Sequence, residues 1–270
     1  MRKFGLAPQT LPDIGPLEFL HCAAEAQYDF VGLRLASPSG ELSSVSSDLR
    51  HIREIAKALA DTDLVLNDVE YVRVGANFDP IAGLAPFFEN TSALGARRVL
   101  TVCEDLDLSR AAENLARLAN LAHQYSLELS LEPLPWTSVS SPLVANELID
   151  ATGSDGIGIL VDALHYFRAG CLAGDLKGIP SGRLHAVQLC DATSLKDITE
   201  AEYLRRARAD RLLPGEGELD LEGLVRSLPD TLMVSVESPV AASAARPAQE
   251  RADRALAALH EVVTRAEAGS

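Results

Sequence analysis

Short runs of apolar residues alternate with longer amphipathic stretches along the whole chain. A short apolar run is typical of a buried strand, whereas apolar residues that recur every three or four positions are typical of a helix. Ser47, Ser109 and Ser140 or Ser141 lie where a helix N-cap is expected. The amphipathic stretches predict helices that include 15–27, 47–60, 109–125, 140–152 and 247–267. The short runs predict eight strands, at residues 3–7, 30–35, 64–68, 98–103, 127–133, 157–162, 184–190 and 232–237.

Eight strands, each followed by a helix, predict a single (β/α)8 TIM barrel that forms one domain over residues 1–270. A doubly wound open sheet is the alternative. That fold normally carries a glycine-rich phosphate loop after its first strand, and GLAPQTLPDIG is not such a loop. In a barrel of this kind the active site forms at the carboxyl ends of the strands, so the last residue of each strand is a candidate.

Three of the predicted strands end in a carboxylate, at Glu132, Asp162 and Glu237. One acid at a strand end is usually a solvated cap, but three at equivalent positions indicate a shared site. Buried carboxylates that converge repel one another and cost several kcal/mol when unpaired, so the three acids imply a bound cation.

The alternation of side chains predicts which residues face the barrel axis. In the strands at 127–133, 157–162 and 232–237, the residues on the face opposite to the acid are branched or apolar. That face packs against the helices, so the acids face inward. The same rule predicts that Ala186, Gln188 and Cys190, in the strand at 184–190, face the interior of the barrel. We therefore expect Gln188 to face the site, and His185 to lie on the helix-facing side or near the start of the strand.

The pattern formed by Glu132, the D-x-x-H of Asp162 and His165, VQLCD and VSVE resembles the xylose-isomerase-like sugar isomerase/epimerase superfamily. The resemblance covers nearly the whole chain, and EPLPWTSV, VDALHYFRAG and RLLPGEGELDL add to it. It implies one divalent metal ion held by four strand-end residues, whose counterparts are Glu132, Asp162, Gln188 and Glu237. The usual third ligand is histidine. A glutamine oxygen suits a hard cation, so we expect Mn, Mg or Co rather than a zinc-selective site.

Four further residues are candidates for substrate contact. The resemblance implies this role for His165, whose alternative is a surface histidine at a helix start. Trp136, the only tryptophan, is able to stack on a sugar-like ring or to pack within its loop. Arg211, in the long connection 191–220, would bind a polar substrate oxygen or form a salt bridge with nearby acids. Glu70 is expected at the rim of the site.

The resemblance implies a metal-dependent isomerase or epimerase that acts on a small polyhydroxylated ketone or aldehyde. The metal would stabilise an enediolate while Glu132 and Glu237 exchange the proton as base and acid. A dehydratase, which loses water from the same enolate, is the alternative within this scaffold. A DNA-repair nuclease is disfavoured, because those enzymes hold a metal cluster with several histidines. A binding protein without catalysis is the third class, and it is favoured only if the purified protein holds no metal.

The composition of the chain limits the classes of molecule that it is expected to bind. With 24 Lys+Arg against 39 Asp+Glu the chain carries a net charge of −15, which disfavours nucleic acid. The four cysteines form no CxxC pair and are expected to be reduced thiols. The first residues lack the apolar core of a signal peptide, and no stretch is long and apolar enough to span a membrane, so a cytoplasmic location is expected. The sequence leaves open whether the chain forms a homo-oligomer.

Overall fold

The eight strands form a closed parallel barrel in chain order, β1-β2-β3-β4-β5-β6-β7-β8. The computed structural model describes residues 2–35, 48–79 and 83–269. The predicted (β/α)8 barrel is thereby confirmed. The strands are β1 Phe4–Leu6, β2 Phe30–Arg34, β3 Val65–Val74, β4 Arg98–Cys103, β5 Glu128–Glu132, β6 Ile157–Asp162, β7 Leu184–Leu189 and β8 Met233–Val236.

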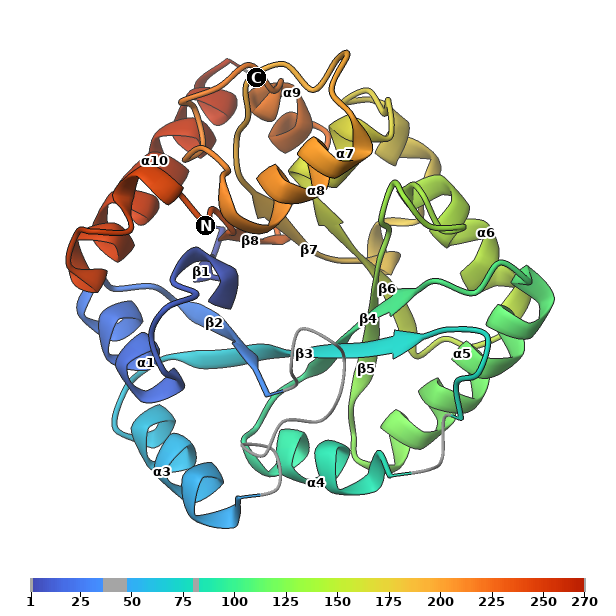
Figure 1. Cartoon of the computed structure of the whole chain (residues 1–270). Coiled ribbons are helices and arrows are strands. Elements are labelled where there is room, and N and C mark those ends of the chain that lie inside the picture. Colours follow the sequence, from blue (N-terminus) through green and yellow to red (C-terminus); the bar gives the residue numbers. More distant parts are fainter. Residues whose placement is uncertain (1, 36–47, 80–82, 270) are drawn as a thin grey trace.

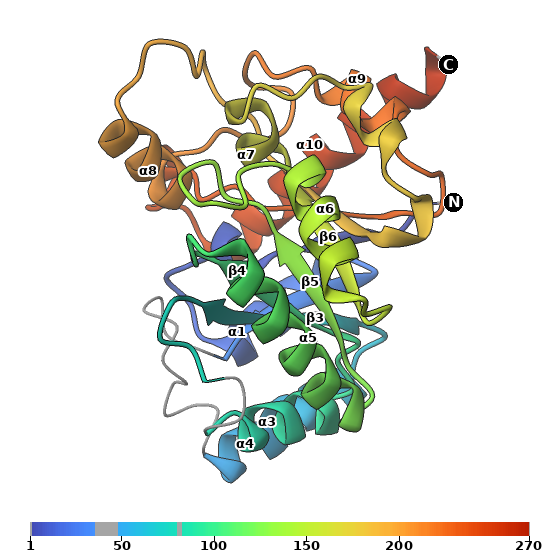
Figure 2. The same ribbon diagram turned by 90° about the vertical axis from the view of Figure 1, so that its right-hand side faces the viewer.

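Helices surround the barrel on all sides (Figure 1). Helix α8 departs from this ring: it lies in front of β7 and β8 in Figure 1 and to one side of the barrel in Figure 2, so it covers one end. Within the described residues, no helix has the length and apolar character needed to cross a membrane. The helices are α1 Pro16–Glu25, α3 Leu49–Ala60, α4 Ala85–Ala93, α5 Leu108–Gln124, α6 Pro142–Thr152, α7 Ala163–Arg168, α8 Glu200–Ala209, α9 Leu221–Arg226 and α10 Ala248–Ala268, with 3-10 turns η1 Pro8–Thr10, η2 Asp175–Gly178, η3 Ser181–Arg183 and η4 Ala241–Ser243.

Two of the predicted helix starts differ from the structure. Asp48 caps α3 by accepting hydrogen bonds from the backbone N–H groups of Arg50 and His51, and Ser47 lies outside the described residues. Asp107, and not Ser109, caps α5, because its carboxylate reaches two backbone N–H groups at 3.1 Å. Ser141 caps α6 as expected.

Side-chain alternation positions the site as the sequence predicted. Leu100, Leu160 and Ala186 form a small cluster of their own inside the barrel. Val187 and Leu189 instead join the large core that the strands share with the helices. Glu132, Asp162 and Gln188 follow the inward parity at the strand ends, where Asp162 is paired with Gln188.

His185 is the exception to this rule. The pairing of β6 with β7 passes from Ile159↔Leu184 to Leu160↔Ala186, so His185 is an extra residue in a bulge. Its imidazole turns inward and its Nδ1 lies 3.0 Å from Ser130 Oγ. The ring fills space above Gly158, where a Cβ atom would lie 2.3 Å from the ring. The helix-facing placement of His185 was wrong, and the placement near the start of the strand was right.

The third strand is longer than predicted. It continues to Val74 rather than ending at residue 68, and its second half carries Glu70 and Arg73. Polar residues interrupt the apolar run that defined the predicted strand. These polar side chains belong in the strand because Asn67, Asp68 and Glu70 are buried with polar partners. Glu70 therefore lies within β3 and not after its end.

Candidate active site

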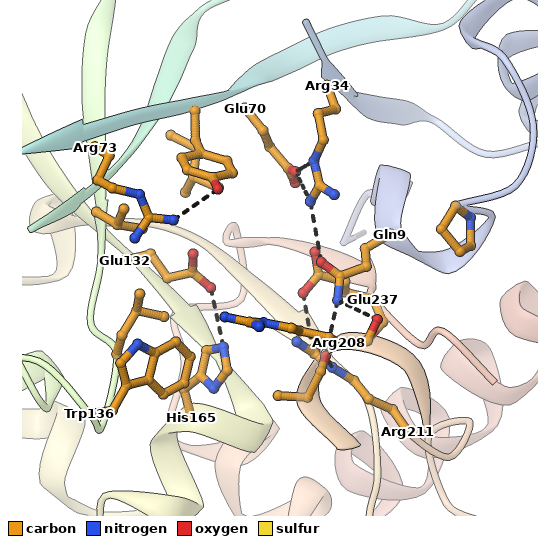
Figure 3. A pocket seen from close by; sticks show the side chains of 16 residues that line it. Gln9, Arg34, Glu70, Arg73, Glu132, Trp136, His165, Arg208, Arg211 and Glu237 are labelled. Atoms are coloured by element: carbon orange, nitrogen blue, oxygen red, sulfur yellow. Dashed lines mark hydrogen bonds and ion pairs between the residues drawn. The ribbon is translucent and has the colours of Figure 1, made fainter. Parts of the chain in front are cut away.

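A pocket of about 500 Å³ opens where the strands end. Figure 3 shows side chains from β2, β3, β5, α7 and α8 that point into it. Its acids are Glu70, Glu132 and Glu237, and Trp136 and His165 lie on one wall. Its arginines are Arg34, Arg73, Arg208 and Arg211. Asp162 lies behind this wall and is 2% exposed.

Arg211 joins two of the acids. Its Nη1 donates to Asp162 Oδ2 at 2.6 Å and lies 3.1 Å from Glu237 Oε2, and the side chain is 2% exposed. Of the two roles weighed for Arg211, the structure shows the salt bridge, although its partners are acids of the site and not of its own loop. A buried ion pair offsets the cost of removing its charges from water only when both partners also form hydrogen bonds, as Arg211 and Asp162 do.

The backbone around Arg211 is fixed from below. Asp191 and Leu212 form a two-way backbone bridge, with N–O distances of 2.9 and 2.8 Å. The Asp191 carboxylate also accepts hydrogen bonds from the backbone N–H groups of Ala192, Gly215 and Leu219. A side chain at Gly217 would collide with that carboxylate, since its Cβ would lie 2.3 Å from Oδ1. The bridge between Asp191 and Leu212 thus joins the two ends of the segment that contains α8, and we call it the closed base of that segment.

The D-x-x-H motif orients His165. Asp162 is the N-cap of α7, and its Oδ1 accepts from the backbone N–H of His165 at 3.0 Å. The imidazole of His165 contacts Tyr203 of α8, with Nδ1 2.6 Å from the phenol oxygen. Nε2 is left facing Glu132 Oε1 at 3.8 Å. His165 is therefore held in place by Nδ1 and presents Nε2 to the site, with Trp136 edge-on to its ring at a centroid distance of 5.2 Å.

Glu70 forms the opposite wall. Arg34 donates to its Oε2 through Nε at 2.8 Å and through Nη2 at 2.5 Å. Arg34 also donates to Gln9 Oε1, and Gln9 in turn donates to the carbonyl oxygens of Ala207 and Arg208 at the end of α8. Glu70 Oε1 is buried without a hydrogen-bond partner among the described residues, so it is available to a hydroxyl group of a ligand.

Burial and charge shift the pKa values of these groups in opposite directions. Burial raises the pKa of Glu132 well above its ordinary value, and the charges of Glu237 and Asp162 add to the rise. Burial also raises the pKa of Glu237, to about 8, although Arg211 opposes the shift. Burial alone would raise the pKa of Asp162, but the charge of Arg211 brings it below its usual range. Burial lowers the pKa of His165 to about 4, so its imidazole is neutral at pH 7.

The described residues fit a divalent cation. Glu132, Asp162 and His165 each offer a ligand atom, and these atoms lie within 4.8 Å of one another. Gln188 Oε1 is buried and has no hydrogen-bond partner among the described residues, as expected for an oxygen that awaits a ligand. The site holds four acids (Glu70, Glu132, Asp162 and Glu237) against the two paired guanidiniums of Arg34 and Arg211, so a bound cation would favour the ionised forms of the two acids whose pKa is raised, Glu132 and Glu237.

The structure brings together most of the residues expected from the sequence. Glu132, Glu237, His165, Trp136, Arg211 and Glu70 all line the pocket, and Asp162 and Gln188 are buried beside one another beneath it. Gln9, Arg34, Tyr203 and Arg208 also belong to the site, but no sequence motif marks them. Only the length of the connection 191–220 pointed toward the last two.

Curated proteins and solved structures resemble this chain in different ways. An inosose isomerase from Bacillus velezensis is 25% identical over 122 residues, which cover 44% of this chain and 41% of that protein. An inosose isomerase from Bacillus licheniformis is 26% identical over 139 residues, 50% of this chain and 48% of that protein. The matched segments thus span less than half the length of these relatives.

The fold likeness extends over the whole chain. The crystal structure of the IOLI protein with a bound zinc atom superposes with a TM-score of 0.80 at 18% identity, covering 97% of this chain and 98% of that one. A structure of L-ribulose 3-epimerase superposes with a TM-score of 0.72 at 18% identity, covering 100% and 97%. At this identity the likeness shows the fold alone. Residues 20–262 match the family model described as xylose isomerase-like TIM barrel, and the chain therefore belongs to this family.

Proposed function

We propose that this protein is a metal-dependent isomerase or epimerase of a small polyhydroxylated ketone or aldehyde. The observation that carries the proposal is the group of buried carboxylates at the ends of β5, β6 and β8, beside one pocket. Buried acids raise one another's pKa, so such a group costs the folded state free energy. Groups of this kind are common at catalytic sites. The partial matches to two inosose isomerases support the same reaction class.

Glu132, Asp162, Gln188 and Glu237 would hold the cation, with His165 Nε2 as a further donor. When bound, the cation would polarise a substrate carbonyl and so make the neighbouring C–H group more acidic. The donor set is mostly oxygen, which favours Mn or Mg, while the imidazole allows Co or Zn.

Glu132 and Glu237 would transfer the proton. Glu132 lies against His165 Nε2 and receives no hydrogen bond from the described residues. A bound cation would favour its ionised form, which would then be free to accept a proton from carbon. Glu237 is paired with Arg211, and its pKa of about 8 suits a group that returns a proton near neutral pH. Trp136 and Glu70 would orient the substrate, by contact with the indole ring and by a hydrogen bond to Glu70 Oε1. His165 would do so instead through Nε2–H when that nitrogen does not bind the cation.

The reaction class is tested by incubating the protein with Mg²⁺, Mn²⁺ or Co²⁺ and a panel of ketoses, aldoses and inososes in D₂O. Proton NMR should show deuterium entering the carbon next to the carbonyl, together with an epimer or isomer. A product that has lost water would assign a dehydratase instead. If no metal supports exchange with any compound of the panel, the proposed reaction is wrong.

The role of Gln188 gives a separate prediction. Gln188→Ala should weaken binding of Mn²⁺ by at least about tenfold, because it removes an oxygen that has no other buried partner. Gln188→His should retain a metal and shift preference toward Zn²⁺ or Co²⁺, since imidazole favours these ions over Mn²⁺. Isothermal titration calorimetry with each chloride salt measures both effects.

His185 supplies the matched control, three residues earlier on the same strand. Its ring contacts Ser130 at the other end of the barrel interior, so His185→Ala should lower thermal stability and leave Mn²⁺ affinity unchanged. Loss of metal binding in His185→Ala, with Gln188→Ala silent, would show that the ligand at this strand is the histidine.

A further inference from the structure

Three of the four arginines that line the pocket are already paired. Arg34 is bound to Glu70, Arg73 to Glu104, and Arg211 to Asp162 and Glu237. Arg208 has no carboxylate partner within the described part of the chain, although acids outnumber bases by 39 to 24. In a protein with so many acids, a pocket guanidinium that none of them neutralises is a site for a negative charge from outside.

The position of Arg208 suits that purpose. It lies in the last turn of α8, and Figure 3 shows its side chain reaching across the pocket toward Glu132 and His165. The backbone beneath it is fixed, because Gln9 Nε2 donates to the carbonyl oxygens of Ala207 and Arg208 at 3.0 and 3.3 Å. The guanidinium is therefore carried on a held backbone at the mouth of the pocket, where it is exposed and makes no side-chain hydrogen bond within the described residues.

The charge of the surrounding groups selects the kind of anion. Among the described arginines of the lining, Arg208 alone lacks a carboxylate partner, so a doubly charged group such as a phosphate monoester would have only one of its two charges matched. A carboxylate carries one charge, and its two oxygens match the fork of one guanidinium. The arrangement thus favours a singly charged, planar group over a dianion.

We propose that the substrate of this pocket is a sugar acid, a polyhydroxylated carbonyl compound with a carboxylate that Arg208 binds. The inference rests on the proposed function, since it names the substrate class of the same site. The carbonyl end lies at Glu132 and Glu237, and the carboxylate lies toward α8.

The test uses three ligands with one carbon skeleton: D-fructose, D-fructuronate and D-fructose 6-phosphate. Trp136 is the only tryptophan and lines the pocket, so its fluorescence reports binding to the full-length protein in Mg²⁺. Fructuronate should bind at least about tenfold more tightly than fructose, the effect expected of one charge-assisted contact. Arg208→Gln should reduce that ratio to about one.

Arg205→Gln is the matched control, because it removes the same charge from the same helix. Arg205 faces solvent and pairs with Glu202 and Asp210, so its loss should leave the ratio unchanged. Equal binding of fructose and fructuronate, tighter binding of the phosphate, absence of fructuronate binding or an Arg208→Gln variant that keeps the preference would each overturn the inference.

The two proposals fail separately. If the wild-type protein exchanges deuterium into neutral ketoses but shows no preference for the acid, the reaction stands and the sugar-acid inference falls. If fructuronate binds through Arg208 but no compound undergoes exchange, the binding inference stands and the proposed reaction falls.

Discussion

Replacing Glu132 by glutamine is expected to remove nearly all proton exchange while it stabilises the metal-free protein. General acid–base catalysis contributes about 10²–10⁴-fold, and loss of a metal ligand adds to that loss. The amide keeps the shape of the side chain and abolishes the repulsion by Glu237 and Asp162. The deuterium exchange assay measures the first effect, and urea denaturation in EDTA measures the second, for which about 1–3 kcal/mol is expected.

The stability gain should depend on pH. Because the pKa of Glu132 is raised in the folded state, its stabilising contribution is present at low pH and is lost as the pH rises through the folded value. The variant has no such loss, so its advantage should grow toward alkaline pH. Glu128→Gln, at the exposed start of the same strand, should change neither activity nor this pH profile. Full turnover in Glu132→Gln would remove the residue from the mechanism.

Replacing Arg211 by methionine is expected to have the largest effect on stability. It leaves Asp162 and Glu237 buried without their shared cation, and breaking a buried pair in this way costs about 3–5 kcal/mol. Urea denaturation at pH 7 in EDTA measures the loss. Adding Mn²⁺ should restore part of the stability, because a bound cation supplies the missing charge.

Two further variants make the Arg211 result interpretable. Arg205→Met removes an exposed ion pair from the neighbouring helix and should cost no more than about 1 kcal/mol. The double variant Arg211→Met/Glu237→Gln removes one of the stranded charges and should recover part of the loss. A loss equal to that of Arg205→Met would mean that the acids of the site do not depend on Arg211.

The inward placement of the strand-end residues was predictable because it follows from a local rule. In a strand, successive side chains point to opposite faces, which fixes the residues of β5 and β6 that face the axis, and Glu132 and Asp162 obey this rule. The rule failed at His185, because a bulge in β7 shifts the parity by one residue for part of the strand. Nothing in LHAVQLC indicates that bulge, since the partner is Gly158 on another strand.

The rest of the site depends on contacts between distant parts of the chain. Gln9 reaches Ala207, Arg34 reaches Glu70, and His165 reaches Tyr203. Gln9, Arg34, Glu70, His165 and Tyr203 are ordinary polar residues in their own segments, and only the closure of the barrel gives each of them its partner. A single sequence carries no signal for such pairs. Glu132 and Asp162, in contrast, are recognisable in the sequence because each is a charged residue that ends an apolar strand.

The closed base at Asp191 has a consequence for how this protein is able to diversify. The chain leaves β7 after Leu189, and the bridge between Asp191 and Leu212 fixes both ends of the segment between them before the chain continues to α9 and β8. The intervening residues, which supply Tyr203 and Arg208, cover the end of the barrel where the acids of the site lie. Substitutions on the pocket side of that segment would alter the shape and charge presented to a ligand, whereas Arg211 stays bound to Asp162 and, through Nε, to the carbonyl oxygen of Ala207. Selection for new ligands thus has one short segment to act on, while the acids of the site keep their positions at the strand ends.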